Sequence, residues 1–210
     1  MKKFFNLDNP FFQFMEKLAD CFIVNFLVVL CSLPIFTIGA AVTACHKVMQ
    51  NMLMDNEQPV LKSYFRAFVS NFKQATILWL ITLLVLAFLI GDFILVHIFF
   101  DGNIAFLFYF IFGAVSIILL GAVSFAYPLL VRYENSLKNH LKNAIILAIS
   151  NLPRTIIMLV VNAIPILLAI VDLKVFVFEL FVLGFIGISI LVCVEVLLVR
   201  PVFRKLEKTP

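Results

Sequence analysis

Four ionisable side chains interrupt stretches of this sequence that are otherwise almost entirely apolar: Asp92, His97, Glu179 and Glu195. A charged group in the hydrocarbon of a bilayer is costly, so each is a candidate for function. Two interpretations stay open. The groups can reach the polar boundary or cap a helix, or they can form a polar crevice or partner-binding surface in which Glu195 pairs with a basic residue. None lies at the middle of its apolar stretch, which argues against a chain of proton-relaying groups.

Motifs that bind phosphates, metals or acyl groups are absent from the 210 residues. The sequence contains no G-x-x-x-x-G-K-[ST], no H-E-x-x-H and no G-x-S-x-G. The four cysteines lack C-x-x-C spacing, and cysteine in an apolar setting behaves as a small hydrophobe. We therefore expect a protein that is not an enzyme, with no catalytic residues, no cofactor and no metal.

Five apolar stretches must position the ionisable groups, at about 18–44, 75–99, 104–131, 155–171 and 175–199. Crossing the hydrocarbon core takes about 20 mostly apolar residues in a helix. A backbone in lipid must satisfy its own hydrogen bonds, which favours helices over open sheets. With 64% hydrophobic residues, the sequence predicts an all-α membrane protein. Its five transmembrane helices would form a bundle, as a single integral membrane domain over residues 1–210.

Two amphipathic segments, at about 59–74 and 137–152, are predicted to be helices in the cytoplasmic interface. In the first, Lys62, Arg66 and Lys73 fall on one side of an apolar stripe. This helix either lies on the membrane surface or docks a cytoplasmic partner. Leu61-Lys62 and Ser70-Asn71 recur eighty residues later as Leu141-Lys142 and Ser150-Asn151, which leaves an internal duplication open.

Helix breakers and small residues mark where helices bend or approach each other. Pro34 removes a helical hydrogen bond, so we expect a kink in the first stretch that faces other helices. Thr37 and Gly39 follow within the same turn or two. In the third and fifth stretches, small residues include Gly121, Gly184 and Gly187, and such positions allow close packing of helices or subunits.

The distribution of Lys and Arg predicts the orientation, because cytoplasmic connections carry an excess of both. Twelve of the 16 fall after the first stretch, after the third, or in the tail. These regions share one side in a five-helix arrangement, so the C-terminus would be cytoplasmic and the N-terminus outside. Lys2 and Lys3 fit an outside position poorly. The alternative is a re-entrant or interfacial first segment that leaves four true spans.

Two motifs in the first half resemble the YesL family of small bacterial membrane proteins. One is Leu33-Pro34-Ile35-Phe36-Thr37-Ile38-Gly39-Ala40-Ala41, and the other runs from Tyr64-Phe65-Arg66-Ala67-Phe68 to Asn71-Phe72-Lys73-Gln74-Ala75 and Leu78-Trp79. The resemblance implies a protein of the bacterial cytoplasmic membrane that accompanies carbohydrate ABC importers. It implies no catalytic or ligand residues.

Two functions follow as expectations. The first is an accessory, non-catalytic subunit that assists or regulates the permeases of an oligosaccharide ABC importer, with the lipid bilayer around it and the ATPase as a further contact of the cytoplasmic helices. The alternative is an autonomous small transporter or channel for a small solute that uses the kink at Pro34. In that case Asp92 and Glu195 should face a shared internal cavity.

Overall fold

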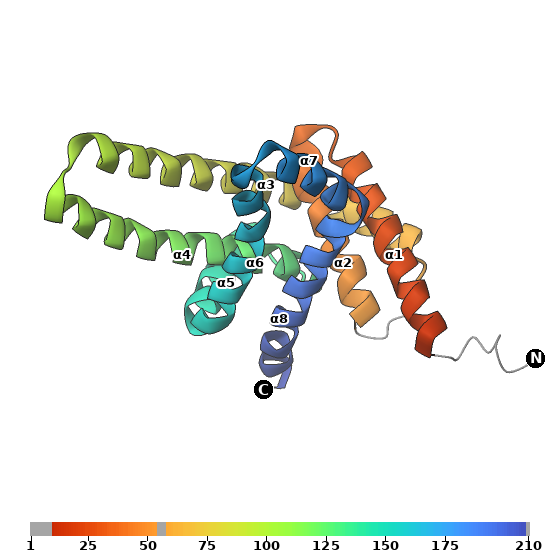
Figure 1. Ribbon diagram of the computed structural model, residues 1–210. Helices are drawn as coiled ribbons and strands as arrows, with labels where there is room; N and C mark the ends of the chain where they lie inside the picture. The colour runs from red at the N-terminus through yellow and green to blue at the C-terminus, as the bar shows by residue number, and fades with distance from the viewer. Residues whose placement is uncertain (1–9, 54–57, 209–210) are drawn as a thin grey trace, which may run out of the picture.

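The computed structural model describes residues 10–53 and 58–208, which are helical nearly throughout and form no strand. The helices are α1 (Pro10–Cys31), α2 (Ile38–Leu53), α3 (Val60–Phe99), α4 (Gly102–Arg132), α5 (Leu137–Ser150), α6 (Leu152–Val171), α7 (Leu173–Val182) and α8 (Ile188–Lys208). A short 3-10 turn, η1 (Ile35–Thr37), precedes α2, and a π-helical turn, η2 (Leu183–Gly187), joins α7 to α8. Figure 1 shows their arrangement.

The stretch predicted as one transmembrane helix at 18–44 is instead two antiparallel helices, α1 and α2 (Figure 1). The chain turns at Ser32–Pro34, where Pro34 adopts an extended conformation with φ −77° and ψ 117°. The Thr37 hydroxyl lies 2.5 Å from the carbonyl oxygen of Cys31 and 2.6 Å from that of Pro34, so it caps this turn. The turn is exposed, with Leu33 73% and Ile35 71% accessible, which corrects the expectation that it faces other helices.

The hairpin also determines where the start of α1 and the end of α2 lie relative to each other. The five-helix arrangement requires the first apolar stretch to begin and end on opposite sides of the bilayer. Because α1 and α2 run antiparallel, the start of α1 and the end of α2 lie on the same side of the molecule, which is also the side where α8 ends (Figure 1). Lys2 and Lys3 lie outside the described residues.

The predicted interfacial helix at 59–74 and the predicted span at 75–99 are one continuous helix, α3, of 40 residues. This corrects the division made from the sequence. Residues 60–99 contain no proline and a single glycine, so nothing interrupts the backbone hydrogen bonds between the two parts. The related segment at 137–152 does separate, as α5, because Asn151 leaves the helical region at φ −128° and ψ 41°. Helix α6 then begins at Leu152, with Pro153 in its first turn.

The outer parts of α3 and α4 form a two-helix arm that extends away from the other helices (Figure 1). We define the arm as residues 83–118. Its two helices pack through aromatic contacts such as Phe93 with Tyr109, whose ring centroids are 5.3 Å apart. Near the tip, the rings of Phe100 and Phe108 approach to 4.5 Å. In this arm only Val96 and Ala105 are fully buried.

The last predicted span, 175–199, is helical but bends at η2, so α7 and α8 point in different directions (Figure 1). The predicted spans at 104–131 and 155–171 lie within α4 and α6. In the described part of the chain, four helical stretches are long and apolar enough to cross a membrane: Val60–Phe99, Gly102–Arg132, Leu152–Val171 and Leu173–Glu207. Four is the number of spans expected if the first segment is re-entrant or interfacial, whereas the main prediction was five.

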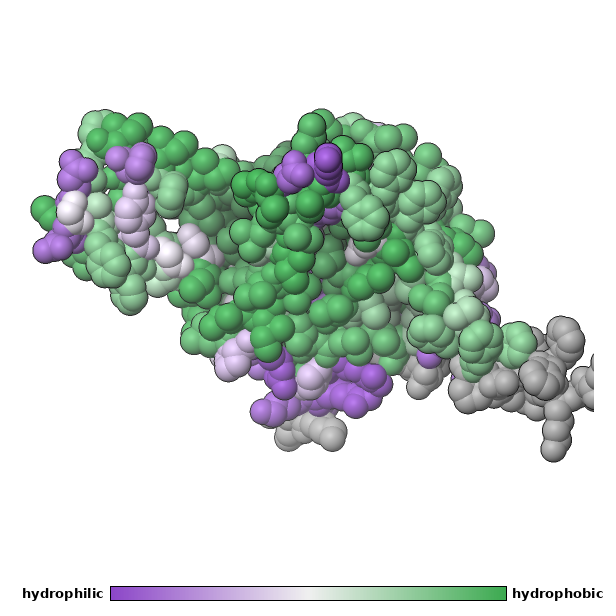
Figure 2. Space-filling view, in the orientation of Figure 1, coloured by the Kyte–Doolittle hydropathy of each residue, from purple (hydrophilic) through white to green (hydrophobic). Residues whose placement is uncertain are grey.

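The surface of the molecule is largely apolar, with hydrophilic residues gathered at the tip of the arm, near the α6–α7 turn and at the lower end of α8 (Figure 2). Such a surface fits a lipid bilayer. The interior contains two apolar clusters. One includes Phe125, Met158 and Phe203, and the other packs α1 and α2 against Tyr64. Tyr127 of the first cluster also contacts the polar side chains described next.

Candidate functional site

Glu195 is buried at a crossing of three helices, with 7% of its surface exposed. One carboxylate oxygen of Glu195, from α8, lies 3.3 Å from Nε2 of His46 on α2. The other oxygen accepts a 2.6 Å hydrogen bond from the side-chain amide of Asn162 on α6. Glu195 therefore neither caps a helix nor reaches the polar boundary. It pairs with the imidazole of His46.

Three further side chains extend this arrangement onto α3 and α4. The Asn162 amide nitrogen lies 3.4 Å from the hydroxyl of Ser124. The His46 ring stacks on Tyr127, with centroids 6.2 Å apart and planes 5° from parallel. The Tyr127 hydroxyl lies 3.4 Å from that of Thr82. We call His46, Thr82, Ser124, Tyr127, Asn162 and Glu195 the polar cluster. It joins five helices that are distant in sequence.

The polar cluster consists of one carboxylate, one imidazole, one amide and three hydroxyl groups, and each oxygen of Glu195 contacts a different helix. His46 Nδ1 and the Thr43 hydroxyl have no hydrogen-bond partner among the described residues. The described part of the chain holds no group of three or more His, Cys, Asp or Glu that could bind a metal ion.

Sequence analysis identified Glu195 but missed His46. The predicted span ended at residue 44, which placed His46 in a connection. The helix break at Pro34 moves the helix that follows, and His46 lies in the middle of α2 with 1% of its surface exposed. Asn162, a polar residue within a long apolar stretch, was the available signal for a buried partner.

The other ionisable candidates lie away from the polar cluster. Asp92 is part of the arm, ten residues and therefore about 15 Å along α3 from Thr82. An autonomous transporter was expected to bring Asp92 and Glu195 to one cavity, whereas Asp92 lies in the arm and outside the polar cluster. His97 Nδ1 lies 3.5 Å from the Tyr109 hydroxyl near the tip of the arm. Glu179 on α7 is 8% exposed, and its Oε2 has no hydrogen-bond partner among the described residues.

The contact between α2 and α3 depends on Gly39. A Cβ at this position would clash with the backbone carbonyl oxygen of Ala75 and would lie 2.6 Å from Cβ of Trp79. Gly39, Ala75 and Trp79 all belong to the two motifs singled out in the sequence. The two motifs therefore meet face to face, and this contact lies within the matched region of a known family. Residues 21–93 match DUF624, a protein family of unknown function. No curated protein and no solved structure matches the chain.

The DUF624 region extends from α1 into the arm and supplies only part of the polar cluster. His46 and Thr82 lie inside the region, whereas Ser124, Tyr127, Asn162 and Glu195 lie beyond it. The buried site is therefore completed by α4, α6 and α8. The DUF624 region also contains Pro34, Thr37, Lys62, Arg66, Lys73 and Asp92.

Of the three glycines predicted at helix contacts, Gly121 is the one whose Cα approaches a side chain of another helix too closely to admit a Cβ. A Cβ there would clash with the side-chain methyl of Thr155 on α6. Gly184 and Gly187 instead lie in the π turn η2. A Cβ on Gly184 would meet nothing within 4 Å, and one on Gly187 would meet Leu183 and Val182 of its own turn. Helix α1 nevertheless packs against this turn, since the Asn25 side-chain amide donates a 2.7 Å hydrogen bond to the carbonyl oxygen of Gly184.

Asn25 of α1, which the sequence analysis did not single out, holds the π turn. Its side-chain amide lies 2.9 Å from the carbonyl oxygen of Leu183 and 2.7 Å from that of Gly184. Its own oxygen accepts a 3.0 Å hydrogen bond from the backbone N–H of Ser189. A π turn leaves backbone groups without regular helical partners, and Asn25 supplies them from another helix. Asn25 thereby fixes α1 against the bend between α7 and α8.

We expect Asn25→Ala to lower the free energy of unfolding by about 1–3 kcal/mol, because it leaves buried backbone groups at η2 without partners. The measurement is denaturant unfolding of the purified protein in detergent micelles. Asn103→Ala, at an exposed position beside the arm tip, is the matched control and should have no effect. Equal stability of the two variants would show that Asn25 does not hold the turn.

Proposed function

We propose that this protein is an accessory, non-catalytic subunit associated with a bacterial carbohydrate or oligosaccharide ABC importer, where it assists or regulates the permeases. The observation that supports an assembly role is the arm. Its apolar side chains face outward along both helices: Leu84 is 70% exposed, Phe106 74% and Phe110 70%. A helical subunit in the same bilayer could pack along this surface.

The identity of the partner rests on the resemblance to the YesL family, and membership of that family is part of the proposal. The match of residues 21–93 to DUF624 supports it without naming a partner. We further propose a multi-pass location in the bacterial cytoplasmic membrane. The α1–α2 hairpin and the basic residues near α2, α4 and α8 support a cytoplasmic side that includes both the start of α1 and the end of α8. Lys62, Arg66 and Lys73 could then contact the ATPase.

Co-purification from the native membrane tests the assembly role. We expect the tagged protein, extracted in mild detergent, to bring importer permeases and the ATPase with it at stoichiometric levels, as identified by mass spectrometry. Replacing Leu84, Phe106 and Phe110 by Ala should reduce that recovery because the arm loses its apolar contacts. The matched control replaces Phe14, Phe26 and Leu30 of α1, which are also exposed. Recovery of a solitary monomer from membranes that contain the importer would contradict the proposal.

An autonomous transporter or channel is the second candidate, and the polar cluster is the observation that favours it. Buried ionisable groups at a helix crossing occur in proteins that move protons or solutes. This candidate requires solute flux in proteoliposomes that contain the chain alone, and Glu195→Gln should alter that flux. The separation of Asp92 from Glu195 supports the subunit role over this one. Absence of flux for every sugar and ion tested would exclude the second candidate.

A further inference from the structure

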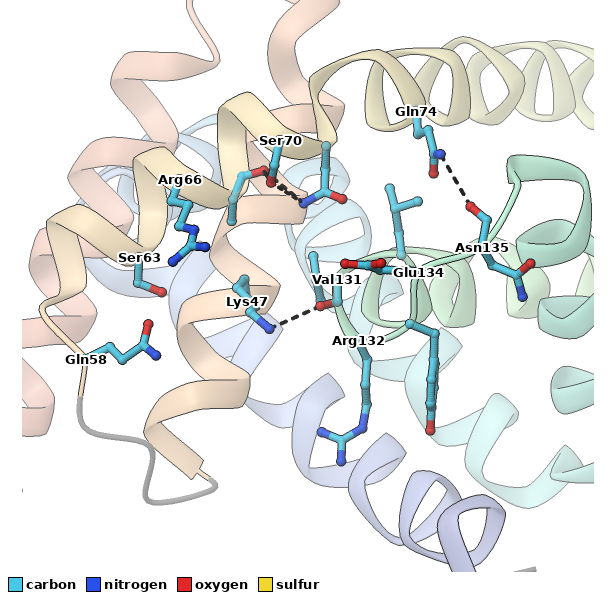
Figure 3. Close-up of a pocket in the computed structure, with 14 residues that line it drawn as sticks. Lys47, Gln58, Ser63, Arg66, Ser70, Gln74, Val131, Arg132, Glu134 and Asn135 are labelled. Atoms are coloured by element: carbon cyan, nitrogen blue, oxygen red, sulfur yellow. Dashed lines mark hydrogen bonds between the residues drawn. The ribbon is translucent and has the colours of Figure 1, made fainter. Parts of the chain in front are cut away.

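A basic cavity lies where the end of α2, the first part of α3 and the end of α4 meet (Figure 3). Its volume is about 580 Å³. Lys47, Arg66 and Arg132 line it, together with one acidic residue, Glu134. All three cations belong to regions whose excess of Lys and Arg indicates the cytoplasmic side. The cavity is distinct from the polar cluster and from the arm.

The cations of this cavity are only partly neutralised. Arg132 donates to Glu207 of α8 at 2.6 Å, so its charge is largely balanced. Lys47 is half-buried and donates one hydrogen bond, of 3.2 Å, to the carbonyl oxygen of Val131. Arg66 makes no hydrogen bond or ion pair with any described residue. Figure 3 shows the head groups of Arg66 and Lys47 turned toward the same space, whereas Arg132 turns toward α8.

The environment of Lys47 is unfavourable for a cation. Burial lowers the pKa of its ammonium group, and the nearby charges of Arg132 and Arg66 lower that pKa further. An anion between Lys47 and Arg66 would offset this repulsion. The Ser63 hydroxyl also lines the cavity and accepts a 2.9 Å hydrogen bond from Asn51, which leaves its own proton available to an acceptor.

We propose that this cavity binds a phosphate group through Lys47, Arg66 and Ser63. An arginine fork, an ammonium and a hydroxyl together match the several acceptor oxygens of a phosphate, and each charge-assisted hydrogen bond is stronger than a neutral one. The phosphate belongs either to a soluble phosphorylated compound or to the headgroup of an anionic lipid. The site goes beyond the proposed function, because it does not depend on an importer.

The test uses the full chain in nanodiscs of phosphatidylcholine, with two probes. Inorganic phosphate is titrated by calorimetry to detect a soluble ligand. Retention of phosphatidic acid, added as a minor lipid, is measured by native mass spectrometry to detect a lipid ligand. We expect at least one probe to bind, and Arg66→Gln and Lys47→Gln each to weaken that binding about tenfold, as loss of a charged hydrogen-bond partner does. Arg66→Lys, which keeps the charge, should weaken it less.

Lys62→Gln and Lys73→Gln are the matched controls, because both remove one exposed cation from the same helix outside the cavity. Arg66 is itself exposed, so Arg66→Gln remains informative even if Lys47→Gln disturbs the fold. Binding of only one probe supports the site. Inorganic phosphate would identify the ligand as a soluble phosphorylated compound, and phosphatidic acid would identify it as a lipid headgroup. Absence of binding by both probes would overturn the proposal. So would equal weakening by Lys62→Gln, which would indicate attraction to the basic surface in general.

Discussion

Glu195→Ala is expected to be the most destabilising single substitution in the interior, with a loss of about 3–5 kcal/mol of unfolding free energy. The Glu195 carboxylate contacts two side chains from two other helices, His46 and Asn162. Its removal leaves buried His46 without an acceptor and leaves the Asn162 amide only its longer, 3.4 Å contact with the Ser124 hydroxyl. His46 has no alternative, because its other ring nitrogen already lacks a partner among the described residues. Unfolding of the purified protein in mixed micelles with increasing SDS measures the loss.

A double-mutant cycle measures the interaction energy between His46 and Glu195 separately from the contacts that each makes with other residues. If His46 and Glu195 interact directly, then His46→Ala combined with Glu195→Ala should cost less than the sum of the two single losses. Glu195→Gln should be less damaging than Glu195→Ala, because a glutamine oxygen can still accept from Asn162. Glu134→Ala, at an exposed position, is the control. A Glu195→Ala protein as stable as this control would show that the cluster does not hold the helices together.

Gly39→Ala should destabilise the protein by about 1–3 kcal/mol, although alanine favours helices over glycine by about 1 kcal/mol. The added methyl clashes with the Ala75 carbonyl oxygen and with Cβ of Trp79, which cannot rotate away. Helices α2 and α3 must therefore separate, and Gly39→Leu should be worse. The measurement is the midpoint of thermal unfolding in detergent, detected by fluorescence size-exclusion chromatography of heated samples.

Gly91→Ala is the matched control for Gly39→Ala, because it makes the same chemical change within α3 and meets nothing within 4 Å. There the helix preference acts alone, so the substitution should stabilise the protein by about 0.5–1 kcal/mol. Opposite signs for the two glycines are thus the expected result. A stabilising Gly39→Ala would mean that α2 and α3 are further apart than the structure places them.

The helical, apolar character of the chain was predictable because it depends on composition and on long apolar runs. The way the first run folds was not. A proline in an apolar stretch indicates a kink, a break or a reversal alike, and the reversal at Pro34 depends on the Thr37 cap and on the packing of Gly39 against α3. The continuity of α3 was missed for a related reason. A change from an amphipathic to an apolar pattern describes the surroundings of a helix rather than its ends.

The candidate site was predictable only where a residue type was unusual for its place. Glu195 stands out in an apolar run, and in the structure it is buried against His46 and Asn162. His46 and Asn25 gain their importance from helices more than a hundred residues away, and no local pattern indicates such contacts. Gly184 and Gly187 were selected as small residues at a helix contact, whereas their place in a π turn held by the Asn25 amide has no local signal in the sequence.

The arm should be locally less stable than the rest of the molecule. Its two helices touch little except each other, so an opening at the tip breaks few contacts, and local stability should fall with distance from Thr82. The inner end is anchored differently, because the Thr82 hydroxyl lies beside Tyr127, whose ring covers His46. A tilt of the arm imposed from outside would therefore move the inner parts of α3 and α4. With them it would move the Tyr127 ring, which stacks on His46 of the one histidine–carboxylate pair in the described part of the protein.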